Sequence, residues 1–533
     1  MSDTANPEND KHKLDVEIEL EEGSQMDNQQ PSPVTSLSIL VLMFLIGLYT
    51  TMDSVIYVPI ANEFNALSMA EWIINGYLIT TTAFQPIYGK VSDIVGRVPA
   101  MVVAALMLMV GSIISAVAQS MTVLIASRAI QGIGSAGMYT MVNILIADLY
   151  SERVRGQFMG LASGVWALSS SGAIVLGGVF VQLSSWRVAF WINIPICVIA
   201  CIVVLWSIKL PKPQGTLGSK VRRIDFGGTL ISLLAVVLVL LALSWGGRDY
   251  PWRSAAVICC LVFGVLVGVL FIVYEGMVPK EPIVPLRLLR TRNVALAFIG
   301  HLFFGAITYA PLMFVPQWAL LVRITTPITS GLYTLPFTLS ELVAVIITGI
   351  CVTRTGRYRE CVWLGSVALL CGLTPLVILD QNTGLGKIIG FLIIAGFGFG
   401  MCIQTLILTA QAGSDGMDSA SATSVCLFMR SLGAILVVAV LSSVSGNVLH
   451  SEFAAASAQY PEYADKIALV SENQSLIHSL GLPNELFDLL VNAFMKGMRA
   501  AFIALIPFSA LFVVSAIAIK HIPLQASKKT TFK

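Results

Sequence analysis

Two stretches of this chain share one pattern, Gly89-Lys-Val-Ser-Asp93-Ile-Val-Gly96-Arg97 and Gly349-Ile-Cys-Val-Thr353-Arg-Thr-Gly356-Arg357. Each has the spacing G-x(6)-G-R, follows a long apolar segment and precedes another one. We interpret them as the same cytoplasmic turn in two halves of a duplicated membrane protein. An internal duplication with several spans in each half is typical of secondary transporters. The two turns therefore predict both a fold and a transport function.

The composition is that of a membrane protein. The chain has 533 residues, of which 56% are hydrophobic and only 12% are charged, and its mean hydropathy is +0.83. A soluble domain of this size would carry far more charge. Crossing about 30 Å of hydrocarbon takes about 20 mostly apolar residues per helix, and about fourteen such stretches can be placed along the chain. We therefore expect an all-α membrane protein.

The distribution of Lys and Arg predicts the orientation in the membrane. Basic residues concentrate in the loops that lie on the same side as the two ends of the chain, so both termini are expected in the cytosol. The loop 446–496 then faces the lumen or the exterior. It contains the sequon Asn473-Gln-Ser475, which makes Asn473 a candidate glycosylation site.

Composition shifts along the chain divide it into five segments. The expected segments are a disordered cytoplasmic tail (1–35), an N-terminal six-helix bundle (36–208), a cytoplasmic linker with two extra transmembrane helices (209–292), a C-terminal six-helix bundle that includes the loop 446–496 (293–519), and a cytoplasmic tail (520–533). The two extra helices are almost uniformly aliphatic, so we expect them to face lipid and to contribute little to the transport path.

Three motifs identify a family resemblance. The stretch from Trp72 to Pro99, which includes Ala83-Phe-Gln85-Pro86-Ile-Tyr-Gly89-Lys, resembles the fourteen-span drug:proton antiporter branch of the major facilitator superfamily. Arg128-Ala-Ile-Gln131-Gly132-Ile-Gly134 and Trp186-Arg187-Val-Ala-Phe190-Trp-Ile-Asn193 match it further along the chain. Within this branch the sequence is most similar to fungal members, including vacuolar basic amino acid transporters and azole-resistance exporters.

The resemblance implies a fold and a mechanism. The expected architecture is the major facilitator fold, in which two six-helix bundles, here with two extra helices, rock around a site near the membrane midplane. Transport would be driven by a proton gradient without any other cofactor. One departure is in the fifth span, where the branch usually carries G-P-x-x-G-G and this chain has Ala173-Ile174-Val-Leu-Gly177-Gly178. Loss of the proline removes a helix kink and leaves open whether the protein is an antiporter or a uniporter.

The repeated turns supply a candidate cytoplasmic gate, consisting of Gly89, Asp93, Gly96, Arg97 and Arg357. Asp93 and Arg97 are four residues apart and can pair on one helical turn. The resemblance implies that this loop latches the two halves together, whereas the simpler alternative is a helix cap that also anchors the orientation. The second copy has Thr353 in place of Asp93, so only the first copy can supply the carboxylate.

Six residues inside the predicted spans are candidates for binding substrate or protons: Asp53, Arg128, Glu341, His301, Tyr49 and Gln131. Asp53 is the only carboxylate in the first span, and the first-span Asp that the branch usually carries falls on Tyr49, one turn earlier. The alternative for Asp53 is a helix cap. Arg128 must face a cavity or a partner, because an unpaired charge in hydrocarbon is costly.

The second half holds the other two titratable candidates. Glu341 lies near the middle of a span between apolar residues, where a carboxyl group can bind a proton or a cationic substrate. Arg430, in a later span, could neutralise it. His301 could carry a proton, and its alternative is a hydrogen-bonded packing residue.

These observations predict a proton-coupled secondary transporter that exports a small cationic solute, with basic amino acids entering the vacuole as the favoured substrates. A multidrug exporter at the plasma membrane is the main alternative, and a non-transporting nutrient sensor is an alternative of another class. The aqueous segments contain no metal cluster, phosphate-binding loop or nucleophile constellation, so we expect no enzyme activity and no metal. The expected partners are a small-molecule substrate, protons and membrane lipid, without nucleic acid, and we expect a monomer.

Overall fold

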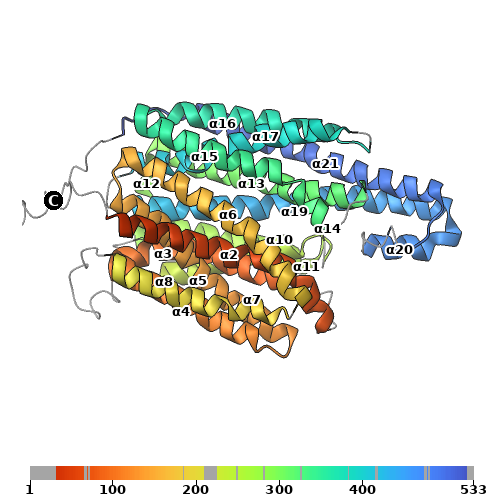
Figure 1. Ribbon diagram of the computed structural model, residues 1–533, viewed down its shortest axis with the longest axis horizontal. Coiled ribbons are helices and arrows are strands. Elements are labelled where there is room, and N and C mark those ends of the chain that lie inside the picture. Colours follow the sequence, from red (N-terminus) through yellow and green to blue (C-terminus); the bar gives the residue numbers. More distant parts are fainter. Residues whose placement is uncertain are drawn as a thin grey trace, which may run out of the picture.

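The computed structural model describes residues 32–524, apart from 65, 67–68, 70–71, 184, 209–224, 248–249, 280–281, 324–326, 382, 415–417, 473–476 and 478–479. Every named element in the described part is a helix, and the long helices run roughly parallel (Figure 1). The prediction of an all-α membrane fold is confirmed. Asn473, the linker residues 209–224 and most of the two predicted tails lie outside the described residues.

The first half of the chain forms one group of helices: α2 (Pro33–Glu63), α3 (Trp72–Val95), α4 (Arg97–Ala116), α5 (Met121–Leu149), α6 (Glu152–Leu183), α7 (Arg187–Trp191) and α8 (Asn193–Ser207). The middle segment contains α10 (Phe226–Trp245), α11 (Ala255–Met277) and α12 (Arg287–Arg290).

The second half forms the other group: α13 (Arg292–Leu321), α14 (Pro327–Leu332), α15 (Leu335–Thr355), α16 (Tyr358–Leu373), the 3-10 helix η2 (Thr374–Ile378), α17 (Leu385–Ile403), α18 (Thr405–Ala412), α19 (Ser419–Gln459), the 3-10 helix η4 (Pro461–Tyr463), α20 (Ala464–Glu472) and α21 (Asn484–Ile517). Figure 1 shows the two groups stacked on one another, with the early helices in one layer and most of the late helices in the other.

Twelve of the described helices are long and apolar enough to cross a membrane. The helices α3 and α6 are not among them, although they have 24 and 32 residues. Each of the two packs against the other half of the protein, α3 against α19 and α6 against α15. Small and polar residues are needed where helices approach closely, and they lower the hydropathy of both.

The repeated turn carries a glycine with a positive φ in both halves, although the two backbone conformations differ. Gly96 joins α3 to α4 with a φ of 113°, and Gly356 joins α15 to α16 with a φ of 70°. These are conformations that favour glycine, because a side chain would clash with the backbone. We call the end of the bundle that carries these two turns the cytoplasmic end, as the charge distribution predicts, and the opposite end the outer end.

The two extra helices differ in their surroundings. Only 11% of the α11 span is buried, which agrees with the expected lipid-facing position. In contrast, α10 packs against α3 from the first half and α19 from the second. Two hydrogen bonds secure this hairpin, from Asn75 to Ser244 at 2.8 Å and from Trp252 to Ser443 at 2.7 Å. One side of α10 therefore contacts both halves, although only 28% of its span is buried.

The segment 446–496, expected to be a loop, is largely helical. The 41 residues of α19 rise about 60 Å, twice the hydrocarbon thickness, so its last turns extend beyond the bundle with α20 and the start of α21 (Figure 1). Phe453 of α19 meets Phe494 of α21 edge to face, and Ile467 of α20 is buried with them. The apolar residues are too sparse for a membrane span but sufficient for a small helical core.

Candidate functional site

The two halves meet closely at the cytoplasmic end, through the first glycine of each repeated turn. Gly89 lies against Ser424 and Ala420 of α19. Gly349 occupies the equivalent position in the second half and lies against α6, where an added Cβ would be 2.9 Å from the Cα of Gln157. The duplicated pattern therefore places a glycine on each side of the same interface.

Buried hydrogen bonds join the halves beside these glycines. Arg155 of α6 donates from Nη1 to Oε1 of Gln411 on α18 at 3.0 Å, and from Nη2 to the carbonyl of Ala147 at 2.5 Å. Gln411 in turn donates to the Thr423 hydroxyl on α19 at 2.8 Å. Since Arg155 and Gln411 are both buried, this chain of contacts is shielded from water.

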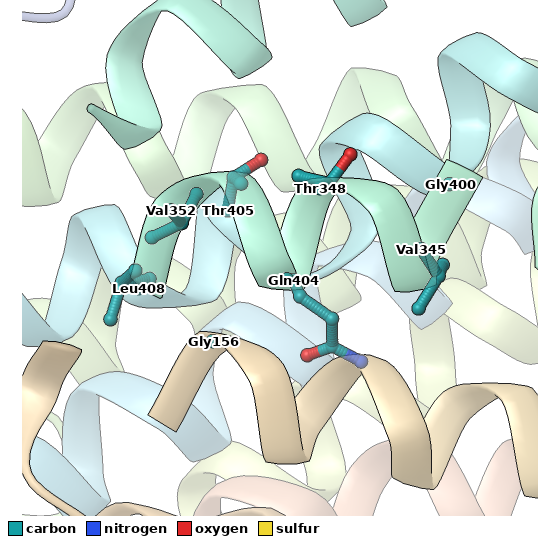
Figure 2. Close-up of a pocket in the computed structure, with 9 residues that line it drawn as sticks. Gly156, Val345, Thr348, Val352, Gly400, Gln404, Thr405 and Leu408 are labelled. Atoms are coloured by element: carbon teal, nitrogen blue, oxygen red, sulfur yellow. The ribbon is translucent and has the colours of Figure 1, made fainter. Parts of the chain in front are cut away.

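Gln404 adds a contact between the halves about two helical turns away from Gln411. It lies at the break between α17 and α18, and its amide nitrogen donates to the Ser163 hydroxyl of α6. Figure 2 shows the side chain pointing from the break towards the helix that carries Gly156. The void beside it has a volume of about 10 Å³, which is room for about one water molecule. The described residues around this void leave too little space for an organic molecule.

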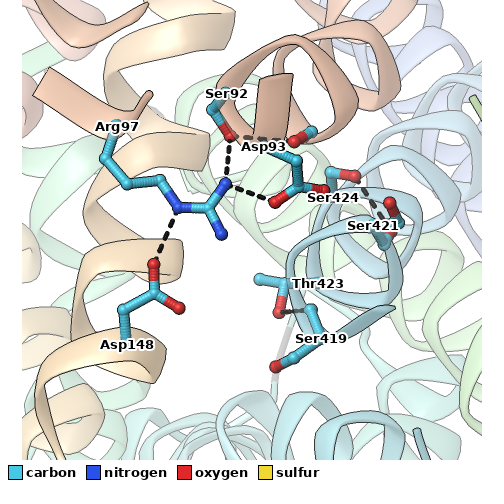
Figure 3. Close-up of polar contacts among 9 residues, drawn as sticks. Ser92, Asp93, Arg97, Asp148, Ser419, Ser421, Thr423 and Ser424 are labelled. Atoms are coloured by element: carbon cyan, nitrogen blue, oxygen red, sulfur yellow. Dashed lines mark hydrogen bonds and ion pairs between the residues drawn. The ribbon is translucent and has the colours of Figure 1, made fainter. Parts of the chain in front are cut away.

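The candidate gate residues of the first turn form one charged cluster (Figure 3). Arg97 binds the Asp93 carboxylate at 2.5 Å and the Asp148 carboxylate at 2.7 Å, and it donates to Ser92 at 2.7 Å. All four residues belong to the first half, so these bonds fix the α3–α4 turn to α5. The cluster faces the serine-rich beginning of α19, which includes Ser424. Asp148 was not among the residues that we predicted for this site.

The second turn has no equivalent cluster. Arg357 is exposed at the beginning of α16, and its guanidinium makes no ion pair within the part of the chain that the structure describes. Thr353, at the position equivalent to Asp93, donates a hydrogen bond to the carbonyl of Gly349 on its own helix. The asymmetry expected from Thr353 is thus present in the structure.

Arg128 is buried near the outer end of α5, with 2% of its surface exposed. Its Nε donates to the carbonyl of Ile73 at 3.1 Å, its Nη1 donates to Oε1 of Gln131, and its guanidinium lies 4.4 Å from the ring centroid of Tyr77. Gln131 also donates to the Ser115 hydroxyl at 3.1 Å. The structure therefore brings these two predicted residues into one polar network between α3, α4 and α5.

Tyr49 reaches the same region from α2. Its hydroxyl donates to the Ser135 hydroxyl at 3.1 Å, and Tyr77 shares a hydrogen bond with the same serine at 2.5 Å. Asp53 lies one turn further along α2, and its side chain is outside the described part of the structure.

A second charged group lies between the halves, further from the cytoplasmic end. Arg430 of α19 donates from Nη2 to the hydroxyl of Tyr139 on α5 at 2.7 Å. Glu341 of α15 and Tyr309 of α13 both interact electrostatically with this guanidinium. Glu341 is only 6% exposed, whereas Tyr309 is 50% exposed and Arg430 is partly exposed. We call these four residues the central cluster.

Two other polar residues, Ser431 and His301, lie near the central cluster without belonging to it. Ser431 donates to Oε1 of Gln85 on α3 at 3.3 Å, so a second bond crosses between the halves next to Arg430. His301 of α13 is fully buried, and its Nδ1 lies 2.8 Å from the carbonyl of Ala297 on its own helix. Its Nε2 has no hydrogen-bond partner within the described residues. A fully buried imidazole bonded to its own helix has no direct contact with the space between the halves.

Several residues of this site escaped the sequence analysis. Tyr139 and Tyr309 lie in helices that carry several other polar residues, and a tyrosine in a helix gives a signal that many packed tyrosines also give. Gln404 and Gln411 could have been noted as amides at membrane depth, but only the structure shows that they face the opposite half. Arg430 was considered solely as a neutralising partner for Glu341, and the two form no ion pair at hydrogen-bond distance.

Comparisons with known proteins agree with this fold. Residues 39–438 match the sequence model of the Major Facilitator Superfamily. The efflux pump dotC of Dothistroma septosporum is 33% identical over 417 residues, which cover 78% of this chain and 71% of that protein. The efflux pump FUS6 of Gibberella fujikuroi is 30% identical over 528 residues, covering 96% and 94%. The crystal structure of the human organic anion transporter MFSD10 has the same fold, with a TM-score of 0.57 at 15% identity over 91% of this chain and 98% of that one.

Proposed function

The chain belongs to the major facilitator superfamily, whose members are membrane transporters rather than enzymes, and we propose that it exports small organic molecules from the cytosol. The observation that carries this proposal is the closure of the cytoplasmic end beneath a central cluster of charged and aromatic residues. Alternating access requires a state in which the central site is closed to the cytosol. In this state a solute bound at Arg430 would leave towards the outer end.

The favoured substrate from the sequence, basic amino acids entering the vacuole, is not supported. Similar proteins from several fungi carry the name efflux pump, which favours the alternative that we gave as an exporter at the plasma membrane. We therefore propose the plasma membrane as the site of action. The nutrient sensor remains the alternative of another class, and the test below separates it from a transporter.

We also propose that the protein has fourteen spans and belongs to the proton-coupled branch. In addition to the twelve apolar helices, α3 and α6 are long enough to cross the membrane and run in the same bundle. Glu341 is the proposed proton-binding residue, because it is a buried carboxyl group beside the central guanidinium and makes no hydrogen bond within the described residues. Proton binding there would change the net charge of the central cluster.

Transport by purified protein in acid-inside proteoliposomes tests the function. Uptake of lysine, a rhodamine cation and a fluorescein anion would be followed with and without a protonophore, for native protein and for Glu341→Gln. We expect uptake of an organic dye but not of lysine, with loss of uptake in both the protonophore and Glu341→Gln samples. Glu452→Gln, which changes an exposed ion pair with Lys496 at the outer end, is the matched control and should transport normally. Specific binding without any flux would contradict export and support the sensor.

A further inference from the structure

The guanidinium of Arg430 has unused hydrogen-bond donors. A guanidinium carries five N–H groups, and the structure gives this one a single hydrogen bond, to Tyr139, within the described residues. None of its nitrogens is among the buried polar atoms that lack a partner. Because the residue is partly exposed, its remaining N–H groups are open to a further acceptor.

The side chains around Arg430 suit a ligand with an aromatic ring. The ring centroid of Tyr139 lies 5.6 Å from the guanidinium carbon, and Tyr309 presents half of its surface on the neighbouring α13. Phenol rings combine an apolar face with a polar edge, so they accept planar ligands at low entropic cost. The two tyrosines come from opposite halves. A ligand between them would therefore lie at the interface of the two halves, which changes during transport.

The charged group next to the two tyrosines is the positive guanidinium of Arg430. Arg430 has no ion-pair partner at hydrogen-bond distance within the described residues, and the carboxylate of Glu341 interacts with it electrostatically from a greater distance. Glu341 is also the more enclosed of the two groups, so the guanidinium is the charge that is more accessible to a bulky ligand. An arginine at membrane depth is stabilised by an anion or by polar partners.

We propose that Arg430 binds the oxyanion of an aromatic organic acid, a carboxylate or a phenolate, and that the exported substrates are anionic rather than cationic. This inference rests on the proposed export function, and it names the substrate class for that site. The planar fork of a guanidinium holds a carboxylate through two parallel N–H donors, a geometry that lysine does not offer. The aromatic ring of the substrate would lie between Tyr139 and Tyr309.

Three matched naphthalene probes test the proposal: 1-naphthoate, the neutral 1-naphthamide and the cation 1-naphthylmethylamine. Binding to full-length protein in lipid nanodiscs would be measured for native protein, Arg430→Gln and Arg430→Lys. We expect native protein to prefer naphthoate over naphthamide by roughly tenfold or more, as charge-assisted hydrogen bonds provide. Arg430→Gln should abolish this preference while still binding the amide, and Arg430→Lys should retain part of it.

A control variant and two outcomes make the test decisive. Arg499→Gln changes an exposed arginine at the outer end that bonds the carbonyl of Val377, and it should keep the native preference. Native preference for the amine, or an unchanged naphthoate preference in both Arg430 variants, would overturn the proposal. Naphthoate binding that depends on Arg430 but is never followed by flux would support this site and contradict the export function, so the two failures are distinguishable.

Discussion

At the scale of single residues, the interface between the halves depends on the absence of side chains. Gly349 lies on α15 at the point of contact with α6, and an added Cβ would meet the backbone of Gln157 rather than a flexible side chain. Backbone atoms can give way only if a whole helix moves. The two halves can therefore close at the cytoplasmic end only while this position has no side chain.

We predict that Gly349→Ala disfavours the closed cytoplasmic end. Overpacking a tight contact typically costs about 1–3 kcal/mol, enough to shift the balance towards the opposite state. The measurement is the rate at which a cysteine introduced at the cytoplasmic interface reacts with a water-soluble maleimide, which should increase. Gly390→Ala, where an added Cβ meets nothing within 4 Å, is the control and should react at the native rate. Equal rates for the two variants would contradict the prediction.

A second prediction for a single residue concerns Glu63, at the outer end of α2, and the pH dependence of stability. Hydrogen bonds from Arg187 and Trp186, each at 2.6 Å, hold the pKa of the Glu63 carboxyl below its usual value. A carboxyl whose pKa is lower in the folded state stabilises the protein above its unfolded pKa, and this contribution is lost as the pH falls through the lower folded value.

We therefore expect the thermal stability of native protein to decrease as the pH falls below about 4.3, the usual pKa of a glutamate. The Glu63→Gln variant should lack that part of the decrease, because its amide does not titrate. The effect will be small, since both side chains of the pair are partly exposed to solvent. Identical pH profiles for the two proteins, measured by differential scanning fluorimetry, would show that the contact contributes nothing.

At the scale of elements, the hairpin of α10 and α11 connects the two halves at the outer end. The buried residues Leu240 and Leu243 of α10 pack with Ile79 of α3 and beside Ile435 of α19. The hydrogen bonds from Asn75 to Ser244 and from Trp252 to Ser443 add polar contacts to each half. The hairpin must deform or detach from one side when the outer end opens and closes.

We predict that the double variant Asn75→Ala, Ser443→Ala weakens this connection. Two lost hydrogen bonds correspond to about 1–3 kcal/mol, so the thermal midpoint should fall and exchange between the two states should become faster. Single-molecule fluorescence between labels on α3 and α19 would measure the exchange rate. Val265→Ala on the exposed face of α11 is the control and should leave the rate unchanged. A rate equal to the native one in the double variant would show that the hairpin is passive.

At the scale of the whole molecule, the contacts that join the halves gather at the cytoplasmic end and at the central cluster. They include Gly89, Gly349, Arg155, Gln404 and Arg430, and they come from α3, α5 and α6 on one side and from α15, α18 and α19 on the other. A rocking motion about the midplane must break the cytoplasmic set as a unit.

We predict that a cross-link between Ser163→Cys and Gln404→Cys stops transport. The two native side chains bond each other across the interface, so a short bifunctional thiol reagent can reach both cysteines and hold the cytoplasmic end closed. Dye flux in proteoliposomes should fall to background after treatment. With a reagent that contains a disulfide, reduction should restore it. Each single cysteine variant is the control for reaction with the native cysteines. Full flux in a cross-linked sample would contradict a rocking mechanism that passes through this closure.

The amino-acid sequence by itself determined the membrane class, the helical fold, the duplication and the pairing of Asp93 with Arg97, because all of these follow from hydropathy and short-range spacing. It also marked Glu341 and Arg128 as charges that need partners. The tertiary structure alone decided the remainder: the addition of Asp148 to the Arg97 cluster, the approach of Arg430 to Tyr139, the helical form of 446–459 and the position of α10 across both halves. These features depend on which faces of distant helices meet, and helix packing is set by the shape of whole surfaces, which no local pattern of residues encodes.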